Sequence, residues 1–210
     1  MSAHPSARDI LNALVAFPTV SHDTNIPLID WVETYLTDIG VTAYRMPNED
    51  GTKHALFCSV GPEVPGGIVL SGHTDVVPVV GQPWTSDPWQ VVEKDGKLFG
   101  RGTCDMKGFD ALALHALQKA VKAPLKRPLQ IALSFDEEIG CAGAPPLIEA
   151  MQKAGLPKAD LAIIGEPSMM KCVTGHKGSS GFDVHVQGYE VHSSLLHTGV
   201  SAIMQAARLV

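Results

Sequence analysis

Short apolar segments of strand length alternate along this chain with segments whose apolar residues recur at helical spacing. The strand-like segments are His54–Val60, Ile68–Gly72, Leu129–Phe135 and Leu161–Gly165. The helix-like segments are Ala7–Phe17, the stretch from Pro27 to Ile39, Lys107–Val121 and Ala144–Lys153. Nearly continuous apolar strands are typical of sheets that are buried on both faces, and their alternation with helices is typical of α/β proteins. The pattern therefore predicts an α/β fold, with a mixed, mostly parallel sheet covered by helices.

The pattern changes after about residue 175. Polar and apolar residues alternate from Phe182 to Gln187, which predicts a half-exposed antiparallel strand in a different sheet. The last stretch, Gly199–Val210, is predicted to be a helix that ends without a capping residue. We therefore expect one domain over residues 1–174 and the incomplete beginning of a second, α+β domain over residues 175–210.

Composition excludes several classes of protein. With 45% hydrophobic and 18% charged residues, the chain has the composition of a globular protein. Its net charge of −6, with no block of basic residues, argues against nucleic acid or an anionic membrane as a partner. No apolar run resembles a signal peptide or a membrane span, so we expect a cytoplasmic protein. The four cysteines include no C-x-x-C pair, so no thiolate zinc site is predicted, and Cys104 and Cys141 are expected to be buried.

A histidine and several carboxylates follow the predicted strands directly. His73 and Asp75 follow one strand, the acidic triplet 136–138 follows another, and Glu166 follows a third. Because the carboxyl ends of parallel strands lie at the same edge of a sheet, we expect these side chains to converge there. Oxygen-rich sites with a minority of imidazole suit Zn²⁺ or its first-row neighbours in hydrolytic pairs.

The spacing of these residues suggests a role for each. Asp75 lies two residues after His73 and so shares its face of an extended backbone, where it can accept a hydrogen bond from the ring nitrogen that faces away from a metal. Taken alone, this pair would more often be a turn histidine with a capping aspartate. Asp105 lies in a glycine-flanked loop, where its carboxylate could bridge two cations or could cap the following helix.

The acidic triplet needs a cation or solvent to relieve its repulsion. Adjacent side chains point to different sides, so Glu138 could bind a metal while Glu137 stays free to hold a proton as a general base. The alternative is a solvated acidic turn.

Five motifs occur in a fixed order along the chain. They are S-G-H-T-D-V-V-P at 71–78, G-R-G-T-C-D-M-K-G at 100–108, D-E-E-I-G-C at 136–141, I-G-E-P-S at 164–168 and V-H-S-S at 191–194. Together they resemble the motifs of the co-catalytic zinc aminoacylase and carboxypeptidase superfamily, the M20 peptidases. The resemblance runs from about residue 8 to the last residue. It is greatest to the branch that removes the acetyl group from N-acetylornithine in arginine biosynthesis.

The resemblance implies a zinc-exopeptidase-like catalytic domain that binds two Zn²⁺ ions, with Co²⁺ as a possible substitute. The implied metal ligands are His73 and Glu166 for one zinc, Glu138 for the other, and Asp105 as the bridge between them. Asp75 is implied to orient His73, and Glu137 to be the general base. A water that bridges the metals would give its proton to Glu137 and attack the amide of a small N-acyl amino acid, so that acetate and ornithine are released.

The second domain resembles the start of the superfamily's lid and dimerisation domain. His192 matches a lid histidine that reaches into the partner's active site in homodimers and stabilises the oxyanion, although a lone lid histidine would more often be structural. The superfamily's chains continue beyond this length and supply a late histidine to the second zinc, so we expect this sequence to be a fragment. The alternatives are a related desuccinylase, a small-peptide carboxypeptidase, or an inactive metal-binding fragment.

Overall fold

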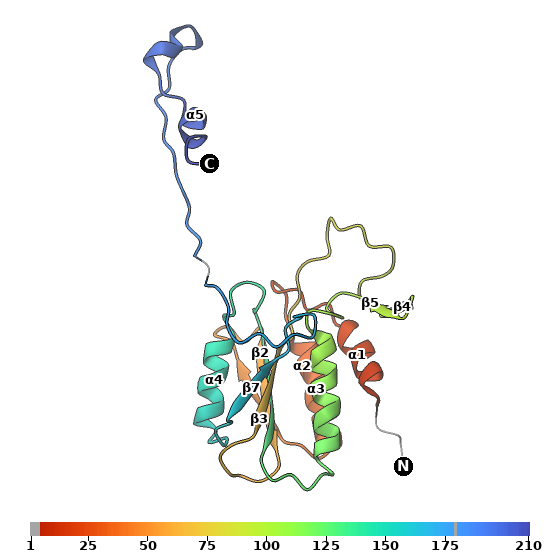
Figure 1. Ribbon diagram of the computed structural model, residues 1–210. Helices are drawn as coiled ribbons and strands as arrows, with labels where there is room; N and C mark the ends of the chain where they lie inside the picture. Colours follow the sequence, from red (N-terminus) through yellow and green to blue (C-terminus); the bar gives the residue numbers. More distant parts are fainter. Residues whose placement is uncertain (1–4, 179) are drawn as a thin grey trace. The chain divides into compact units, whose positions relative to one another are not determined.

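A computed structural model describes residues 5–178 and 180–210, which form two compact units, one that ends at Met170 and one from Lys171 to Val210. The first unit is a five-stranded sheet between two helical layers (Figure 1). Its strands are β1 (Ala43–Pro47), β2 (His54–Val60), β3 (Ile68–His73), β6 (Leu129–Ser134) and β7 (Leu161–Ile164). Helices α1 (Ala7–Val15), α2 (Ile26–Asp38) and α3 (Lys107–Ala120) cover one face, and α4 (Ala144–Lys153) lies on the other.

The strand order is β1-β2-β6-β3-β7. Strand β2 is antiparallel to both β1 and β6, whereas β3 is parallel to both β6 and β7. Four of the five strands therefore run in the same direction, which confirms the predicted mixed, mostly parallel sheet. Strand β1 was not predicted, because its sequence A-Y-R-M-P shows neither a continuous apolar run nor a regular alternation.

Side chains of the central strands alternate between the two faces of the sheet. Leu56 and Leu133 are buried under the layer of α1, α2 and α3. Phe57 and Ala132 lie on the opposite face, where they pack with Leu147 of α4. Because successive residues of a strand point to opposite faces, both sides of the sheet are apolar, as the sequence pattern requires.

Lys107, the first residue of α3, ties that helix to α1. Its ammonium group is buried and donates hydrogen bonds to the backbone carbonyls of Leu14, at 3.0 Å, and Phe17, at 2.7 Å. These carbonyls lie at the end of α1, where helical hydrogen bonds leave acceptors unpaired. Burial lowers the pKa of Lys107 to about 7. The link fixes the start of α3, which immediately follows Asp105.

A long segment between β3 and α3 carries a separate two-stranded hairpin, β4 (Val92–Lys94) and β5 (Lys97–Phe99). After this hairpin, the guanidinium of Arg101 lies over the ring of Trp84, 5.2 Å from its centre. The segment then returns to the sheet edge at Asp105.

The second unit differs from the prediction. It holds a short 3₁₀ helix η1 (Ser193–Thr198) and helix α5 (Ala202–Ala206), with an isolated bridge between Tyr189 and Val200. The predicted strand at 182–187 is wrong, because these residues form no strand, and Phe182 is 85% exposed. A strand requires a neighbour to pair its backbone groups, and the described residues of this unit provide none at 182–187. The predicted helix at Gly199–Val210 is limited to α5. Over the described ranges, no helix is long and apolar enough to cross a membrane.

Candidate metal centre

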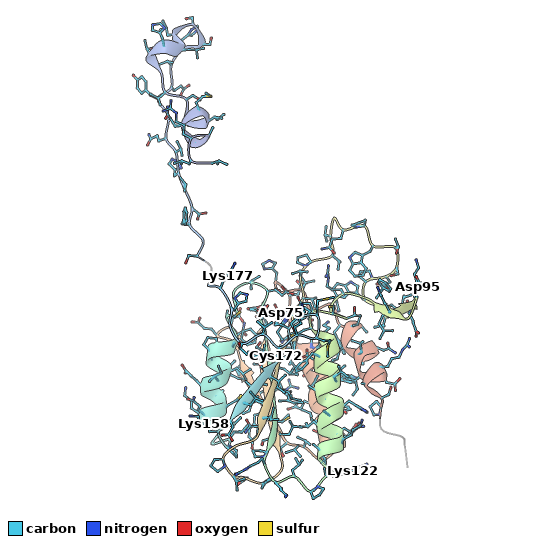
Figure 2. All side chains as sticks on the ribbon, in the orientation of Figure 1. Asp75, Asp95, Lys122, Lys158, Cys172 and Lys177 are labelled. Carbon is cyan, nitrogen blue, oxygen red and sulfur yellow. The ribbon has the colours of Figure 1, made fainter. Side chains whose placement is uncertain are left out.

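Three parallel strands end side by side at one edge of the sheet. His73 closes β3 opposite Ser134, the last residue of β6, and β7 runs parallel to β3 on its other side. Figure 2 shows Asp75 at this edge, and Lys122 and Lys158 at the opposite end of the sheet. The residues that follow β3, β6 and β7 therefore meet, as the sequence predicted.

The imidazole of His73 lies at the centre of a group of carboxylates. Its Nε2 atom is 3.2 Å from Oδ1 of Asp105, 3.5 Å from Oε1 of Glu166 and 3.8 Å from Oε2 of Glu137. Glu138 joins His73 and Asp105 in a group whose ligand atoms all lie within 4.8 Å of one another. The structure thus brings together the four predicted ligands and the predicted general base.

The donor set fits a divalent metal. Zinc binds nitrogen and oxygen at about 2.0–2.2 Å, so two such ligands of one tetrahedral ion lie about 3.3–3.6 Å apart. The distances from His73 Nε2 to Asp105, 3.2 Å, and to Glu166, 3.5 Å, are close to this range. One imidazole among several carboxylates is also a donor set suited to first-row metals.

The protonation behaviour of the ligands shows how strongly negative the site is. Burial, with the nearby charges of Asp105 and Glu137, raises the pKa of Glu166 to about 7. Burial and the charge of Asp105 also raise the pKa of Glu138. Carboxylates held in this way gain from a cation that neutralises them.

The pKa of His73 is also raised, which for an imidazole favours the charged form. Burial alone lowers its pKa, but the hydrogen bond and the charge of Asp75, with smaller contributions from neighbouring carboxylates, outweigh burial and raise the pKa to about 10. Without a metal, the ring therefore takes up a proton where the metal would bind.

The predicted contact between His73 and Asp75 exists, but its nearest acceptor is the backbone. Nδ1 of His73 lies 2.9 Å from the carbonyl oxygen of Asp75 and 3.5 Å from its carboxylate Oδ1. The assignment of Nδ1 as the donor follows from these acceptors, and it leaves Nε2 free to bind a metal.

The carboxylate of Asp75 makes its closer contacts elsewhere. It accepts hydrogen bonds from the backbone N–H groups of Glu137, at 3.1 Å, and Glu138, at 3.3 Å, and from the hydroxyl of Ser21, at 2.7 Å. Burial works against ionisation, but the hydrogen bonds from His73, Ser21 and Glu137 outweigh it and lower the pKa of Asp75. Asp75 therefore joins the end of β3 to the turn after β6. Ser21 was not predicted as part of the site, because a serine after a helix carries no distinctive signal.

The turn after β6 also contains a thiol. Sγ of Cys141 lies 3.3 Å from Oε1 of Glu137 and donates to it. Cys141 and Cys104 are both exposed, which contradicts the expectation that they are buried. Both follow strands or hairpins as part of the loops that form the site, and loops lie at the surface.

Beneath the cluster lies a carboxyl group that the sequence analysis also missed. Asp110, on the first turn of α3, is buried, and its Oδ1 has no hydrogen-bond partner among the described residues. It packs against Gly72, where an added Cβ would lie only 2.0 Å from this oxygen. Burial raises the pKa of Asp110 to about 8, so the group is mostly protonated at neutral pH. Gly72 in the S-G-H-T-D motif is thus required by close packing.

His192 belongs to the second unit and precedes η1. Its Nδ1 accepts a hydrogen bond from the backbone N–H of Ser194 at 3.2 Å and lies 2.9 Å from the hydroxyl of the same residue. These contacts leave the ring proton on Nε2.

Comparisons with known proteins agree with this geometry. A family model described as peptidase family M20/M25/M40 matches residues 69–210. An acetylornithine deacetylase from Myxococcus xanthus is 40% identical over 98% of this chain and 53% of its own length. Another from Klebsiella pneumoniae is 39% identical over 95% of this chain and 52% of its own length. The chain spans about half the length of these curated relatives.

Solved structures show the same fold. An M20 family metallo-carboxypeptidase from Sulfolobus solfataricus superimposes with a TM-score of 0.66 and 20% identity, over 77% of this chain and 37% of the other. A tripeptidase from Staphylococcus aureus gives a TM-score of 0.60 and 20% identity, over 96% of this chain and 54% of the other.

Proposed function

Because the chain belongs to peptidase family M20/M25/M40, we propose that it provides the metal centre of a hydrolase that converts N-acetylornithine to ornithine and acetate. The observation that carries the proposal is the convergence of Asp105, Glu138 and Glu166 on the imidazole of His73. The identity of about 40% to two acetylornithine deacetylases supports this substrate over other amides. Production of ornithine would place the protein in arginine biosynthesis, and we infer a cytoplasmic location for that role.

We assign the site to two divalent cations, Zn²⁺ first, with Co²⁺ as a substitute. His73 and Glu166 would hold one ion, Glu138 the other, and Asp105 would bridge them. When bound, such ions polarise the substrate carbonyl and make a water molecule more acidic. The rest of the chemistry belongs to the side chains.

Glu137 is the proposed general base. Its backbone is fixed by Asp75, and Oε1 accepts a hydrogen bond from Cys141. Its Oε2 is 3.8 Å from Nε2 of His73, close enough to the ligand set to share a water with it. Glu137 would take one proton from the attacking water, whose hydroxyl joins the acetyl carbon. It would then give that proton to the amine of ornithine as the carbon–nitrogen bond breaks.

We further assign residues 1–174 to the catalytic domain and residues 175–210 to the start of a lid through which two copies pair. In such a homodimer, His192 would donate its Nε2–H to the oxyanion in the active site of the partner. The hydrogen bond from Ser194 to Nδ1 supports this role, because it leaves the proton on the nitrogen that would act as donor.

A competition experiment tests the proposal. Zinc-loaded protein, as the 210-residue chain and as a form extended to the next in-frame stop, is given N-acetylornithine, N-succinyl-diaminopimelate and a dipeptide at equal concentration. We expect the extended form to hydrolyse N-acetylornithine fastest, with no turnover after chelation. Preference for the succinyl compound or the dipeptide would instead indicate a desuccinylase or a carboxypeptidase. Bound zinc without hydrolysis in either form would indicate a metal-binding chain with no activity.

A further inference from the structure

Lys53, which directly precedes β2, contacts Asp136, the first residue of the acidic turn at the metal centre. Its side chain is 11% exposed, and its ammonium group donates to the backbone carbonyl of Ser21 and forms an ion pair with Oδ1 of Asp136. Neither acceptor belongs to β2, the strand that follows Lys53. A lysine buried to this extent is usually paired, and here both partners belong to segments that reach the metal centre.

Asp136 starts the acidic turn in an unusual backbone conformation. Its φ is +56°, in the left-handed region, which residues other than glycine seldom adopt. Its carbonyl accepts the N–H of Ala142 at 3.1 Å, which closes the turn. Asp136 is paired with Lys53 and is not in the groups of candidate ligands that Glu137 and Glu138 form with His73. Of the three consecutive acids, one is therefore neutralised by the protein itself, and two remain for the cluster around His73.

Ser21, Lys53, Asp75 and the acidic turn are joined in a ring of hydrogen bonds. The carbonyl of Ser21 binds Lys53, and its hydroxyl donates to Asp75 at 2.7 Å. Asp75 in turn accepts the N–H groups of Glu137 and Glu138. The acidic turn is thus held at its start by Lys53 and at its next two residues by Asp75, and Ser21 joins these two anchors.

We propose that Lys53 is a positioning residue, which by its ion pair with Asp136 sets where the carboxylates of Glu137 and Glu138 lie relative to His73. This inference rests on the proposed function, because it concerns the same metal centre and general base. Loss of Lys53 would free Asp136 and add its unpaired charge to the turn, so Glu138 would bind its metal less tightly and Glu137 would be misplaced. His73, Asp105 and Glu166 are held by other elements, and their metal would bind as before.

The test compares three variants of the extended form. Lys53→Met keeps the length of the side chain but removes its charge and its hydrogen-bond donors. Lys53→Arg keeps the charge and the donors. As a control, Lys122→Met removes an exposed lysine at the opposite end of the sheet. Zn²⁺ binding is measured by competition with a chromophoric chelator, and kcat and KM are measured with N-acetylornithine.

We expect Lys53→Met to weaken the binding of one of two zinc ions by about 10–100-fold and to lower kcat by a similar factor, with KM nearly unchanged. Lys53→Arg should retain most of the zinc affinity and most of kcat, and Lys122→Met should match the wild type in both. Wild-type affinity for both ions in folded Lys53→Met would overturn the proposal, because it would show that Lys53 does not affect how Glu138 binds a metal.

A second variant covers the case in which Lys53→Met does not fold. Asp136→Gly removes the carboxylate while tolerating the positive φ, so it breaks the ion pair without backbone strain. It should show the same selective loss of one zinc ion, and unchanged affinity for both would overturn the proposal. The zinc measurement also separates the two claims: a wild type that binds two zinc ions without hydrolysing N-acetylornithine contradicts the proposed function only, and the zinc affinities still decide the role of Lys53.

Discussion

Oδ1 of Asp75 accepts a hydrogen bond from the backbone N–H of Glu137 at 3.1 Å, and the backbone carbonyl of the same aspartate lies 2.9 Å from Nδ1 of His73. The two residues are 62 positions apart in the sequence and belong to the ends of different strands. Asp75 thereby links the position of the proposed metal ligand His73 to that of the proposed base Glu137.

The Asp75→Asn variant tests this relationship. Replacement of one carboxylate oxygen by an NH₂ group would direct a donor at the N–H of Glu137, or at the hydroxyl of Ser21 and the N–H of Glu138. We expect zinc affinity to fall by about 10–100-fold, as measured by chelator competition. Asp50→Asn is a matched control, because Asp50 also accepts a backbone N–H, from Thr52 at 3.0 Å, but lies in an exposed turn. Equal affinities in the two variants would contradict the role of Asp75.

Metal binding should stabilise the fold through the same ligands. Zinc at 100 times its dissociation constant would add about 2.7 kcal/mol to the free energy of unfolding, because it binds the folded state. We expect Glu166→Gln to reduce this gain, and Glu63→Gln, at an exposed position, to leave it intact. Urea denaturation with zinc and with chelator measures the gain in each protein. A gain that is the same in Glu166→Gln and wild type would argue against Glu166 as a ligand.

The buried carboxyl of Asp110 makes stability depend on pH. Its pKa rises from an ordinary value of 3.8 to about 8 on folding, so between these values the folded chain holds a proton that the unfolded chain has lost. The free energy of unfolding therefore falls as pH rises through this window, by about 1.4 kcal/mol per pH unit from this group. Asp110→Asn removes the titration.

Urea denaturation of the metal-free chain at pH 5 and pH 7 checks this expectation. From pH 5 to pH 7 the free energy of unfolding of the wild type should fall relative to that of Asp110→Asn. The interval does not extend above the lowered pKa of Lys107, about 7, so that Lys107 keeps its charge over most of it. Parallel stability profiles of the two proteins would show that Asp110 ionises normally in the folded state.

Two leucines of helix α3, one buried and one exposed, test which face of the helix packs against the core. Leu114 is fully buried among α1, α2 and the sheet, whereas Leu112 is 60% exposed. We expect Leu114→Ala to lower the free energy of unfolding by about 2–5 kcal/mol, because it leaves a cavity. Leu112→Ala should change it by about 0.5 kcal/mol or less. Similar losses in both variants would mean that this face of α3 is packed differently.

The sheet and the site follow from the sequence to different degrees. The apolar runs of β2, β3, β6 and β7 mark strands because a sheet covered on both faces leaves little room for polar residues. Their parallel direction then brings His73, Glu138 and Glu166 to one edge. The sequence did not reveal β1 or the place of β6 between β2 and β3, because strand order depends on pairing between distant segments.

The residues that support the site were missed for a related reason. Ser21, Lys53 and Asp110 carry no motif, and their importance arises from contacts across 32 to 83 positions of sequence, such as that between Lys53 and Asp136. The alternating pattern near Phe182 was misleading, because alternation describes which side chains could face a core and not whether a partner strand is present. Local patterns thus predicted which side chains come together, and only the fold shows what holds them in place.

A comparison of the wild type with Glu137→Gln, in the zinc-loaded, extended form of the protein, tests the proposed role of Glu137. Glutamine keeps the size of the side chain and an oxygen that can accept from the Cys141 thiol, but it cannot take a proton from water. We predict equal zinc content and a kcat for N-acetylornithine that is about 10²–10⁴-fold lower in the variant. Hydrolysis within a few-fold of the wild type, at equal zinc content, would contradict the assignment of Glu137 as the base and with it the account of this site.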